Sequence, residues 1–244
     1  MQAGAPLPLG ATVVDGGVNF AVRSAVAERV VLCLYDTEGH ETAQFDLPGY
    51  SDGTWHGFLP HATAGQRYGY RVHGRYQPEE GLRCNPNKLL LDPYCRQIDG
   101  RFDWQDSLFD YRANTDPADA VPCTLDNQYA VARSVVCAEA PPASAGPGIP
   151  WRDTLLYEVN VRGYTMQHPA VDAADRGRFR GLTNGEVLEY LRALGITSVE
   201  LLPVHYFIDE HFLRQQGLRN YWGYNTLNFF TPAARYAGAD PRKE

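Results

Sequence analysis

The sequence lacks the features that mark several classes of protein. Its 244 residues contain no run of about eighteen apolar residues, so we expect no membrane-spanning helix. The opening stretch MQAGAPLPLG has no basic start and no apolar core, and an ordinary export signal is therefore not expected. Acidic residues outnumber basic ones, with a formal net charge of −7 at pH 7, and the basic residues form no cluster. This argues against a nucleic-acid partner and favours a neutral ligand.

Cysteine and lysine are also scarce. The five cysteines are odd in number and include no C-x-x-C spacing, which favours neither a disulfide framework nor a zinc site. We expect reduced thiols in a cytosol. The small share of lysine beside arginine is a bias that we attribute to codon usage in a GC-rich bacterial genome. The sequence therefore predicts a cytoplasmic bacterial protein without a metal or other cofactor.

Apolar and aromatic residues are plentiful, at 44% and 12%, which is ample for a buried core. From residue 12 to about 75 the apolar residues alternate with polar ones, as half-buried strands require. Val18, Phe20 and Val22 alternate in this way, and RYGYRVHG at 67–74 repeats the pattern. Glycine- and aspartate-rich turn signals separate these stretches, so we expect a small antiparallel β-sandwich.

The next part of the chain is less regular. Residues 76–137, which include the proline-flanked NPNKLLLDPY at 85–94, are interpreted as a long connection lying on the neighbouring domain. The stretch AEAPPASAGPGIP at 138–150 is rich in proline, alanine and glycine and predicts a linker. The sequence thus predicts a first domain over 1–137, a linker over 138–150 and a second domain over 151–244.

The second domain begins with a different pattern. TLLYEVNV at 154–161 is a nearly continuous apolar run, and ITSVELLPV at 196–204 is another. Between them, Thr183 and Glu186 have the spacing of a helix capping box, and Gly195 is placed to end that helix. Strand, helix and strand in this order predict one βαβ unit with parallel strands.

The ordered motifs together resemble the isoamylase-type glycogen debranching enzymes, a family of the α-amylase superfamily of glycoside hydrolases. The stretches that carry the resemblance are PLG (8–10), VNFAVRSAVAERVVLCLYD (18–36), WHGFLP (55–60), RYGYRVHG (67–74), NPNKLLLDPY (85–94), LYEVNVRGYT (156–165), HP (168–169), RGRFRGL (176–182), LGITSVELLPVH (194–205) and NYWGYN (220–225). Their order and spacing make the resemblance specific over nearly the whole chain.

The resemblance implies a starch-binding-type, immunoglobulin-like β-sandwich followed by the first βαβ part of an incomplete (β/α)₈ barrel. It implies hydrolysis of α-1,6 branch linkages in glycogen or limit dextrin, with Tyr224 matching the tyrosine that stacks on the glucose beside the scissile bond. A sugar presents an apolar face to aromatic rings and hydroxyls to amides. Tyr221, Trp222 and Asn225 are therefore further candidate contacts, together with Asn220. The alternative for such rings is core or lid packing.

Hydrolysis with retention needs two carboxyl groups about 5 Å apart. The resemblance places a nucleophilic aspartate, an acid/base glutamate and a further stabilising aspartate after barrel strands four, five and seven, whereas this chain is expected to reach only strand two. Asp209 and Glu210 are adjacent and are interpreted as a solvated loop, while Glu158 and Glu186 have structural explanations. No catalytic residue is therefore assigned in this chain. Far fewer residues follow position 150 than the roughly 200 to 250 of a closed barrel, so we expect a fragment of a longer enzyme.

Some residues and one alternative function stay open. Trp55 and Trp104 suit either a sandwich core or a glycan-binding surface, and His205 and His211 lack metal-ligand spacing. The favoured hypothesis is the front part of a debranching hydrolase that is inactive by itself. The alternative is a non-catalytic α-glucan-binding protein, which would be expected to end near residue 140. The sequence makes no prediction of oligomeric state.

Overall fold

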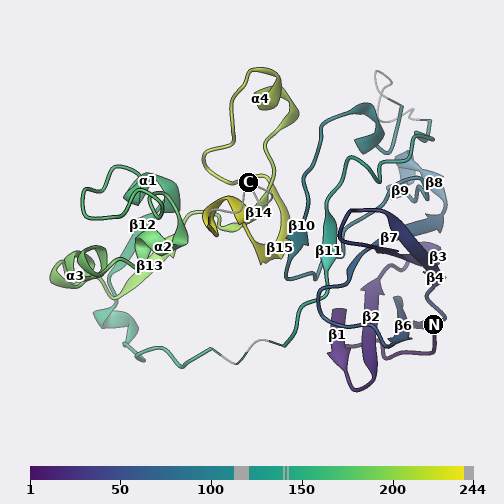
Figure 1. Cartoon of the computed structure of the whole chain (residues 1–244), viewed down its shortest axis with the longest axis horizontal. Coiled ribbons are helices and arrows are strands. Elements are labelled where there is room, and N and C mark those ends of the chain that lie inside the picture. Colours follow the sequence, from purple (N-terminus) through teal and green to yellow (C-terminus); the bar gives the residue numbers. More distant parts are fainter. Residues whose placement is uncertain (113–120, 140, 142, 239–244) are drawn as a thin grey trace. The chain divides into compact units, whose positions relative to one another are not determined.

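The computed structural model describes residues 1–112, 121–139, 141 and 143–238, and this part of the chain is predominantly β-sheet. The chain divides into two compact units, Met1–Glu139 and Ala140–Glu244 (Figure 1). All five cysteines are free thiols.

The first unit contains the strands β1 (Gly10–Val14), β2 (Gly17–Arg23), β3 (Ala27–Tyr35), β4 (Glu41–Asp46), β5 (Gly49–Ser51), β6 (Thr54–Pro60), β7 (Arg67–Gly74), β8 (Tyr76–Gln77), β9 (Leu82–Arg83), β10 (Ile98–Asp99) and β11 (Arg133–Val135), with the 3₁₀ helices η1 (Pro78–Glu80) and η2 (Asp106–Leu108). The second contains η4 (Trp151–Asp153), β12 (Leu156–Val159), α1 (Val161–Thr165), α2 (Phe179–Leu182), α3 (Gly185–Ala193), β13 (Ser198–Leu201), β14 (His205–Phe207), α4 (His211–Gln215), β15 (Thr226–Pro232) and η5 (Ala234–Tyr236).

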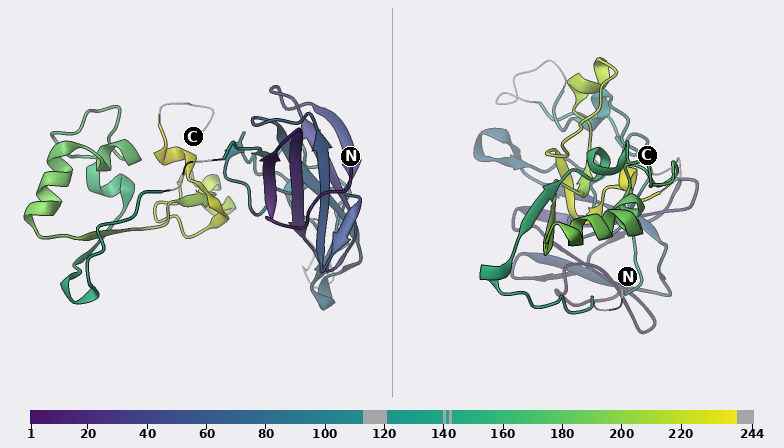
Figure 2. Two further views of the ribbon diagram at one scale, coloured as in Figure 1. Left: turned by 90° about the horizontal axis from the view of Figure 1, so that it is seen from below. Right: turned by 90° about the vertical axis from the view of Figure 1, so that its left-hand side faces the viewer.

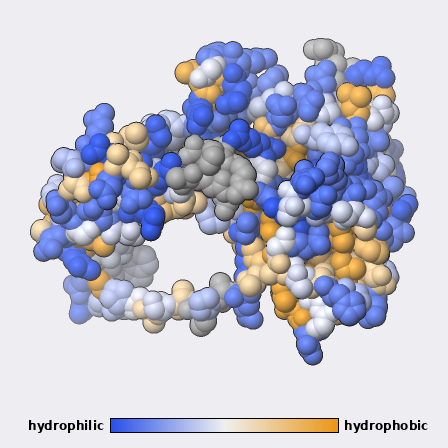
Figure 3. Space-filling model, in the orientation of Figure 1, coloured by the Kyte–Doolittle hydropathy of each residue, from blue (hydrophilic) through white to orange (hydrophobic). Residues whose placement is uncertain are grey.

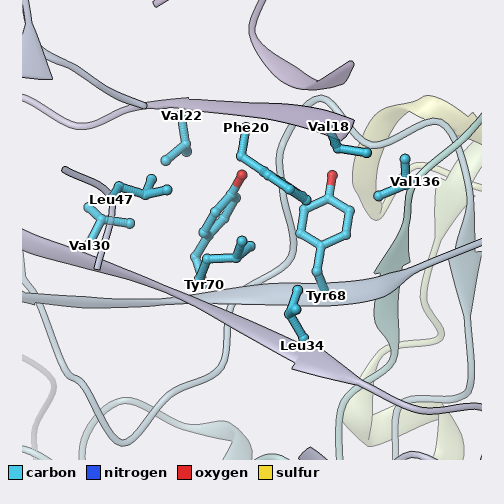
Figure 4. Close-up of a cluster of buried hydrophobic side chains, with 10 residues drawn as sticks. Val18, Phe20, Val22, Val30, Leu34, Leu47, Tyr68, Tyr70 and Val136 are labelled. Carbon is cyan, nitrogen blue, oxygen red and sulfur yellow. The ribbon is translucent and has the colours of Figure 1, made fainter. Parts of the chain in front are cut away.

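Two antiparallel sheets build the first unit, one in the order β1-β2-β6-β5 and the other in the order β10-β11-β7-β3-β4 (Figure 2). Their inner faces share one core, in which Val18, Phe20 and Val22 of β2 meet side chains of β3 and β7 (Figure 4). The rings of Phe20 and Tyr68 lie edge to face with centroids 5.1 Å apart. The predicted placement of these three side chains on one face is therefore confirmed, but β2 is not half-buried, because Asn19 and Ala21 between them are buried too. Truncating Phe20 to alanine would cost about 3–5 kcal/mol, since its side chain is fully buried.

The outer face of the five-stranded sheet is covered by the described residues 85–112 and 121–132, which are called the covering segment below. Val31, Cys33 and Tyr35 point to this face of β3 and pack with Leu89. The Asn127 side chain both accepts from the Leu89 amide and donates to its carbonyl, at 2.6 and 3.1 Å. The expectation that residues 76–137 lie on the neighbouring domain is thus wrong for this segment. It completes the first unit, because an apolar outer face has to be shielded from water.

Arg71 fastens the same segment to the sheet. From β7 its guanidinium donates to both carboxylate oxygens of Asp126, at 2.9 and 2.8 Å, and to the carbonyl of Pro86. Only 10% of the Arg71 side chain is exposed, so these bonds compensate for the cost of burying its charge.

A buried carboxylate joins the core to this cover. Asp92 is completely buried and accepts hydrogen bonds from the hydroxyls of Tyr68 and Tyr70, at 2.8 and 3.4 Å. The amide of Tyr94 donates to its other oxygen. Removal from water disfavours the ionised form and raises the pKa of Asp92 to about 6, although the hydrogen bonds act in the opposite direction.

In the second unit, β12 and β13 pair in parallel, from Leu156 beside Ser198 to Val159 beside Leu201. The helices α1, α2 and α3 lie in the connection between the two strands. The predicted parallel pairing is present. A small cluster of buried residues, Val171, Val187 and Leu191, packs the face of α3 against partly buried neighbours that include Tyr157 and Ile196.

The ends of α3 differ in part from expectation. Its N-cap is Asn184, whose side-chain oxygen accepts from the Glu186 amide at 3.0 Å. The predicted Thr183 cap is therefore wrong, and the Thr183 hydroxyl donates to the carbonyl of Arg180 instead. Asn184 takes the N-cap position in place of Thr183 because asparagine is among the residues most favoured there. Gly195 lies just past the helix with a φ of 79°, so the predicted glycine stop is confirmed.

We expect Asp92 to make the first unit less stable as pH rises. The pKa of this group is higher in the folded state than its ordinary value of 3.8, so its favourable contribution is present below pH 4 and is lost through pH 6. The free energy of unfolding of the wild type, taken relative to Asp92→Asn, should fall by at most about 3 kcal/mol between pH 4 and pH 7. Urea denaturation at both pH values measures this difference.

The exposed Thr124 offers a control that adds or removes no titratable group. Thr124→Ser should keep the same difference from wild type at both pH values. An equally constant difference for Asp92→Asn would show that Asp92 does not titrate as described.

Candidate functional site

The loop between α4 and β15 carries the aromatic residues predicted from the sequence. Tyr221, Trp222 and Tyr224 are exposed over 44%, 58% and 71% of their surfaces. The rings of Tyr221 and Trp222 meet edge to face, with centroids 5.2 Å apart and planes at 87°. Large apolar rings held at the surface are costly unless a ligand or another part of a protein covers them. The structure thus brings these three predicted residues together in one exposed loop.

Asn220 organises this loop with three hydrogen bonds. Its side-chain oxygen accepts from the Gly223 amide at 2.7 Å, and its side-chain nitrogen donates to Glu210 at 2.9 Å. Its own amide donates to Asp209 at 2.8 Å. Since both halves of the side-chain amide are used within the loop, Asn220 positions the rings. It does not present a free amide to a ligand.

Asp209 and Arg235 anchor the loop from either side. Their side chains form an ion pair at 3.0 Å and are only 12% and 24% exposed. The Arg235 guanidinium also lies over the ring of Phe207, 4.1 Å from its centroid. The interpretation of Asp209 and Glu210 as a solvated loop is therefore wrong. Both carboxylates accept hydrogen bonds from Asn220. These bonds hold the two groups within the loop and do not arrange them as a catalytic pair.

Two further residues fix the backbone of the loop. The Asn225 side-chain nitrogen donates to the Ile208 carbonyl, and the Ile208 amide donates to the Asn225 carbonyl, both at 3.2 Å. Gly223 has a φ of 83°, and a Cβ there would lie 2.9 Å from the Pro203 carbonyl oxygen. Only glycine fits this position without strain.

Asn160 links the loop to the parallel strands. It follows β12 directly, caps α1 by accepting from the Gly163 amide at 2.9 Å, and donates to the Tyr221 carbonyl at 3.3 Å. The aromatic loop therefore lies at the carboxyl end of β12, the end at which parallel α/β proteins bind their ligands. An asparagine before a helix is a local signal for the cap, but no local pattern signals the contact across 61 positions.

The remaining sequence candidates have other surroundings. Trp55 packs against the core, and its indole donates to the Ser24 carbonyl at 3.1 Å. Trp104 lies beside Phe109 in the first unit. His205 and His211 have different partners. The His205 ring packs against Phe229, and the His211 ring forms a hydrogen bond with the Gln215 side chain. Glu158 lies on β12, and Glu186 lies in the first turn of α3.

One group of metal-type ligands occurs in the described residues. Asp36, Glu38 and His40 bring one ligand atom each to within 4.8 Å of one another on an exposed turn. The Asp36 carboxylate accepts from the amides of His40 and Glu38, which lowers its pKa. These bonds close the turn between β3 and β4, which is a sufficient reason for the cluster.

Comparison with known proteins agrees with the two-unit architecture. Residues 8–95 match the model of carbohydrate-binding module 48, the isoamylase N-terminal domain. Glycogen debranching enzymes from Erwinia tasmaniensis and Enterobacter sp. strain 638 are 45% and 44% identical, over 100% and 99% of this chain. The chain is a homologue of glycogen debranching enzymes. It spans 36% of the length of each of these two relatives.

Solved structures with a similar fold are also found for this chain. A pullulanase from Anoxybacillus sp. LM18-11 matches 97% of the chain with a TM-score of 0.67 at 22% identity, and the chain covers 30% of that protein. Among the described residues, no helix is both long and apolar enough to cross a membrane.

We predict that Arg235 keeps the aromatic loop ordered. Arg235→Met removes the ion pair and leaves Asp209 partly buried without this cation, at a cost of about 1–3 kcal/mol. Amide hydrogen exchange at residues 220–225 should become at least about tenfold faster, as expected for a loss of 1.4 kcal/mol. Arg219→Met, at an exposed position next to the loop, is the matched control and should leave these rates unchanged. Equal exchange in the two variants would contradict the anchoring role.

Proposed function

We propose that this chain is the substrate-binding front part of a glycoside hydrolase that cleaves α-1,6 branch linkages of glycogen or limit dextrin. The observation that carries the proposal is the 45% identity to a glycogen debranching enzyme along the entire chain. The match of residues 8–95 to a carbohydrate-binding module supports the same substrate class. The exposed aromatic loop adds a surface suited to a sugar.

For the architecture, we propose a starch-binding-type β-sandwich over 1–137, a linker over 138–150 and the start of a (β/α)₈ barrel from 151. The two sheets with a shared core support the first element. The parallel pair β12–β13 supports the last. Leu156 and Val199 on these strands are 53% and 42% exposed, a degree of exposure that further barrel strands and helices would remove.

Within the site, Tyr224 is proposed to stack on the glucose ring at the reacting position, with Trp222 and Tyr221 beside it. Tyr224 is the most exposed of the three rings, and a flat ring covers the apolar face of a pyranose. Asn225 is a further proposed contact through its side-chain oxygen, since its nitrogen is bonded to Ile208. The rings are held in place by Asn220 and its anchors.

The catalytic carboxylates are proposed to come from the part of the relatives that this chain does not span. Asp209 and Glu210 are bound into the loop and cannot converge on one bond. The chain alone is therefore proposed to be inactive. A second candidate, a non-catalytic α-glucan-binding protein, is favoured by the module match at residues 8–95. A bacterial cytoplasm is the proposed location, which agrees with five free cysteines. Hydrolysis by two carboxyl groups requires no cofactor.

In an enzyme that joins this chain to the catalytic remainder of such a relative, Tyr224→Ala should lower kcat/KM for limit dextrin at least about tenfold. That factor corresponds to about 1.4 kcal/mol of stacking in the transition state, where the sugar ring flattens. Tyr221→Ala, the control in the same loop, should have a smaller effect. Release of linear maltooligosaccharides measures both, and equal rates for Tyr224→Ala and wild type would refute the stacking role.

The 244-residue chain incubated with glycogen should release no reducing ends. Hydrolysis that co-purifies with a homogeneous 27.2 kDa chain would oppose this expectation. In that case Asp209→Asn and Glu210→Gln would show whether the loop carboxylates take part.

A further inference from the structure

A cavity of about 590 Å³ opens in the first unit, between β2, β3, β7, residues 83–110 and Asn127. Its volume lies in the range of small-ligand sites, about 300–1,000 Å³. Its lining is mainly apolar and includes Val26, Val72, Leu90, Trp104, Phe109 and Asp110. Val26 and Leu90 stay 52% and 45% exposed. The face of the chain seen in Figure 3 mixes hydrophilic and hydrophobic surface. The cavity therefore leaves apolar surface open to a ligand.

Two aromatic rings of the lining lie near each other. The centroids of Trp104 and Phe109 are 6.2 Å apart, with ring planes at 39°. Tyr111, which is not a lining residue, lies behind this pair, with its centroid 5.7 Å from that of Phe109 and the planes at 55°. The two tilted rings of the lining give a surface for a flat apolar ligand. Trp104, Phe109 and Tyr111 all lie beyond residue 95, where the match to the carbohydrate-binding module ends.

The polar groups of the cavity are fixed in position by other parts of the unit. Asp110 pairs with Arg83 at 3.1 Å and accepts from the Tyr76 hydroxyl at 3.4 Å. The Asn85 side chain donates to the Asp110 carbonyl at 3.0 Å. The Lys88 ammonium is buried and donates to two carbonyls, at 2.7 and 2.8 Å. The wall that carries Phe109 and Asp110 is thus preorganised, which lowers the entropic cost of binding.

These charges select against an ionic ligand. Arg83 is neutralised by Asp110, Lys88 donates to two backbone carbonyls, and Arg23 donates to the Asp52 carbonyl, so the three cations of the lining are not arranged to bind a phosphate. Asp110 and Arg83 are partly exposed and can exchange hydrogen bonds with hydroxyl groups. A neutral molecule with apolar faces and hydroxylated edges fits both the rings and this polar pair.

We propose that the cavity binds glucosyl units of an α-glucan chain, with Trp104 and Phe109 against the sugar faces and the Arg83–Asp110 pair at the hydroxyls. The choice of an α-glucan rests on the proposed function. A chain held in the first unit would raise the effective concentration of its neighbouring segments for the aromatic loop of the same protein.

Titration calorimetry of the 244-residue chain with maltoheptaose tests the proposal. Trp104→Leu keeps apolar volume but removes the ring, and it should weaken binding at least tenfold. Trp151→Leu is the matched control, since Trp151 is 86% exposed in the second unit, and it should change the affinity less than twofold. Unchanged affinity in Trp104→Leu, or no binding by the wild type, overturns the proposal.

Tyr224→Ala separates this site from the proposed function. It should leave maltoheptaose binding to the cavity within twofold of wild type. Binding that is lost in Tyr224→Ala and kept in Trp104→Leu would refute the cavity while leaving the debranching function in place. If Trp104→Leu lowers the unfolding midpoint of the first unit, Val26→Phe replaces it. This change narrows the cavity from an exposed position and should also weaken binding at least tenfold; full affinity in Val26→Phe overturns the proposal.

Discussion

The burial of β3 on both faces is the constraint on which the first unit depends. Alternate residues of this strand belong to two different clusters, so neither face can remain in water. One face is covered by the sheet that contains β2, and the other by the covering segment, residues 85–112 and 121–132. Gly69 on the neighbouring β7 shows how closely this cover approaches, because a Cβ there would lie 2.8 Å from the Leu89 side chain. Covering the second face also builds the wall of the cavity.

In the second unit, the aromatic loop holds large rings at the surface without an apolar cover. Hydrogen bonds of Asn220 and the Asp209–Arg235 ion pair fix this loop instead. A loop fixed in this way would lose little freedom on binding the proposed sugar, so more of the stacking energy would be available for affinity. The same bonds hold the adjacent carboxylates of Asp209 and Glu210 within the loop.

Much of the first unit could be predicted because its signals are local. Alternation placed Val18, Phe20 and Val22 on one face, and in the second unit a glycine placed the end of α3. Alternation could not reveal that the outer face of the sheet is covered, because polar residues such as Asp126 and Asn127 make the covering segment resemble a surface connection. The loop anchors were missed for a similar reason. Asp209 meets Arg235 across 26 positions, and no local pattern signals such a pair. The aromatic loop itself was found through family resemblance.

The central claim is that this chain supplies the substrate-binding front of a debranching hydrolase. The most direct measurement replaces the matching segment of the Erwinia tasmaniensis glycogen debranching enzyme with this chain and assays the hybrid on limit dextrin. The account predicts release of linear maltooligosaccharides from α-1,6 branches, at a rate within about tenfold of the parent enzyme, since 1.4 kcal/mol is a modest loss for a hybrid interface. A folded hybrid that binds glycogen but cleaves no branch would contradict it.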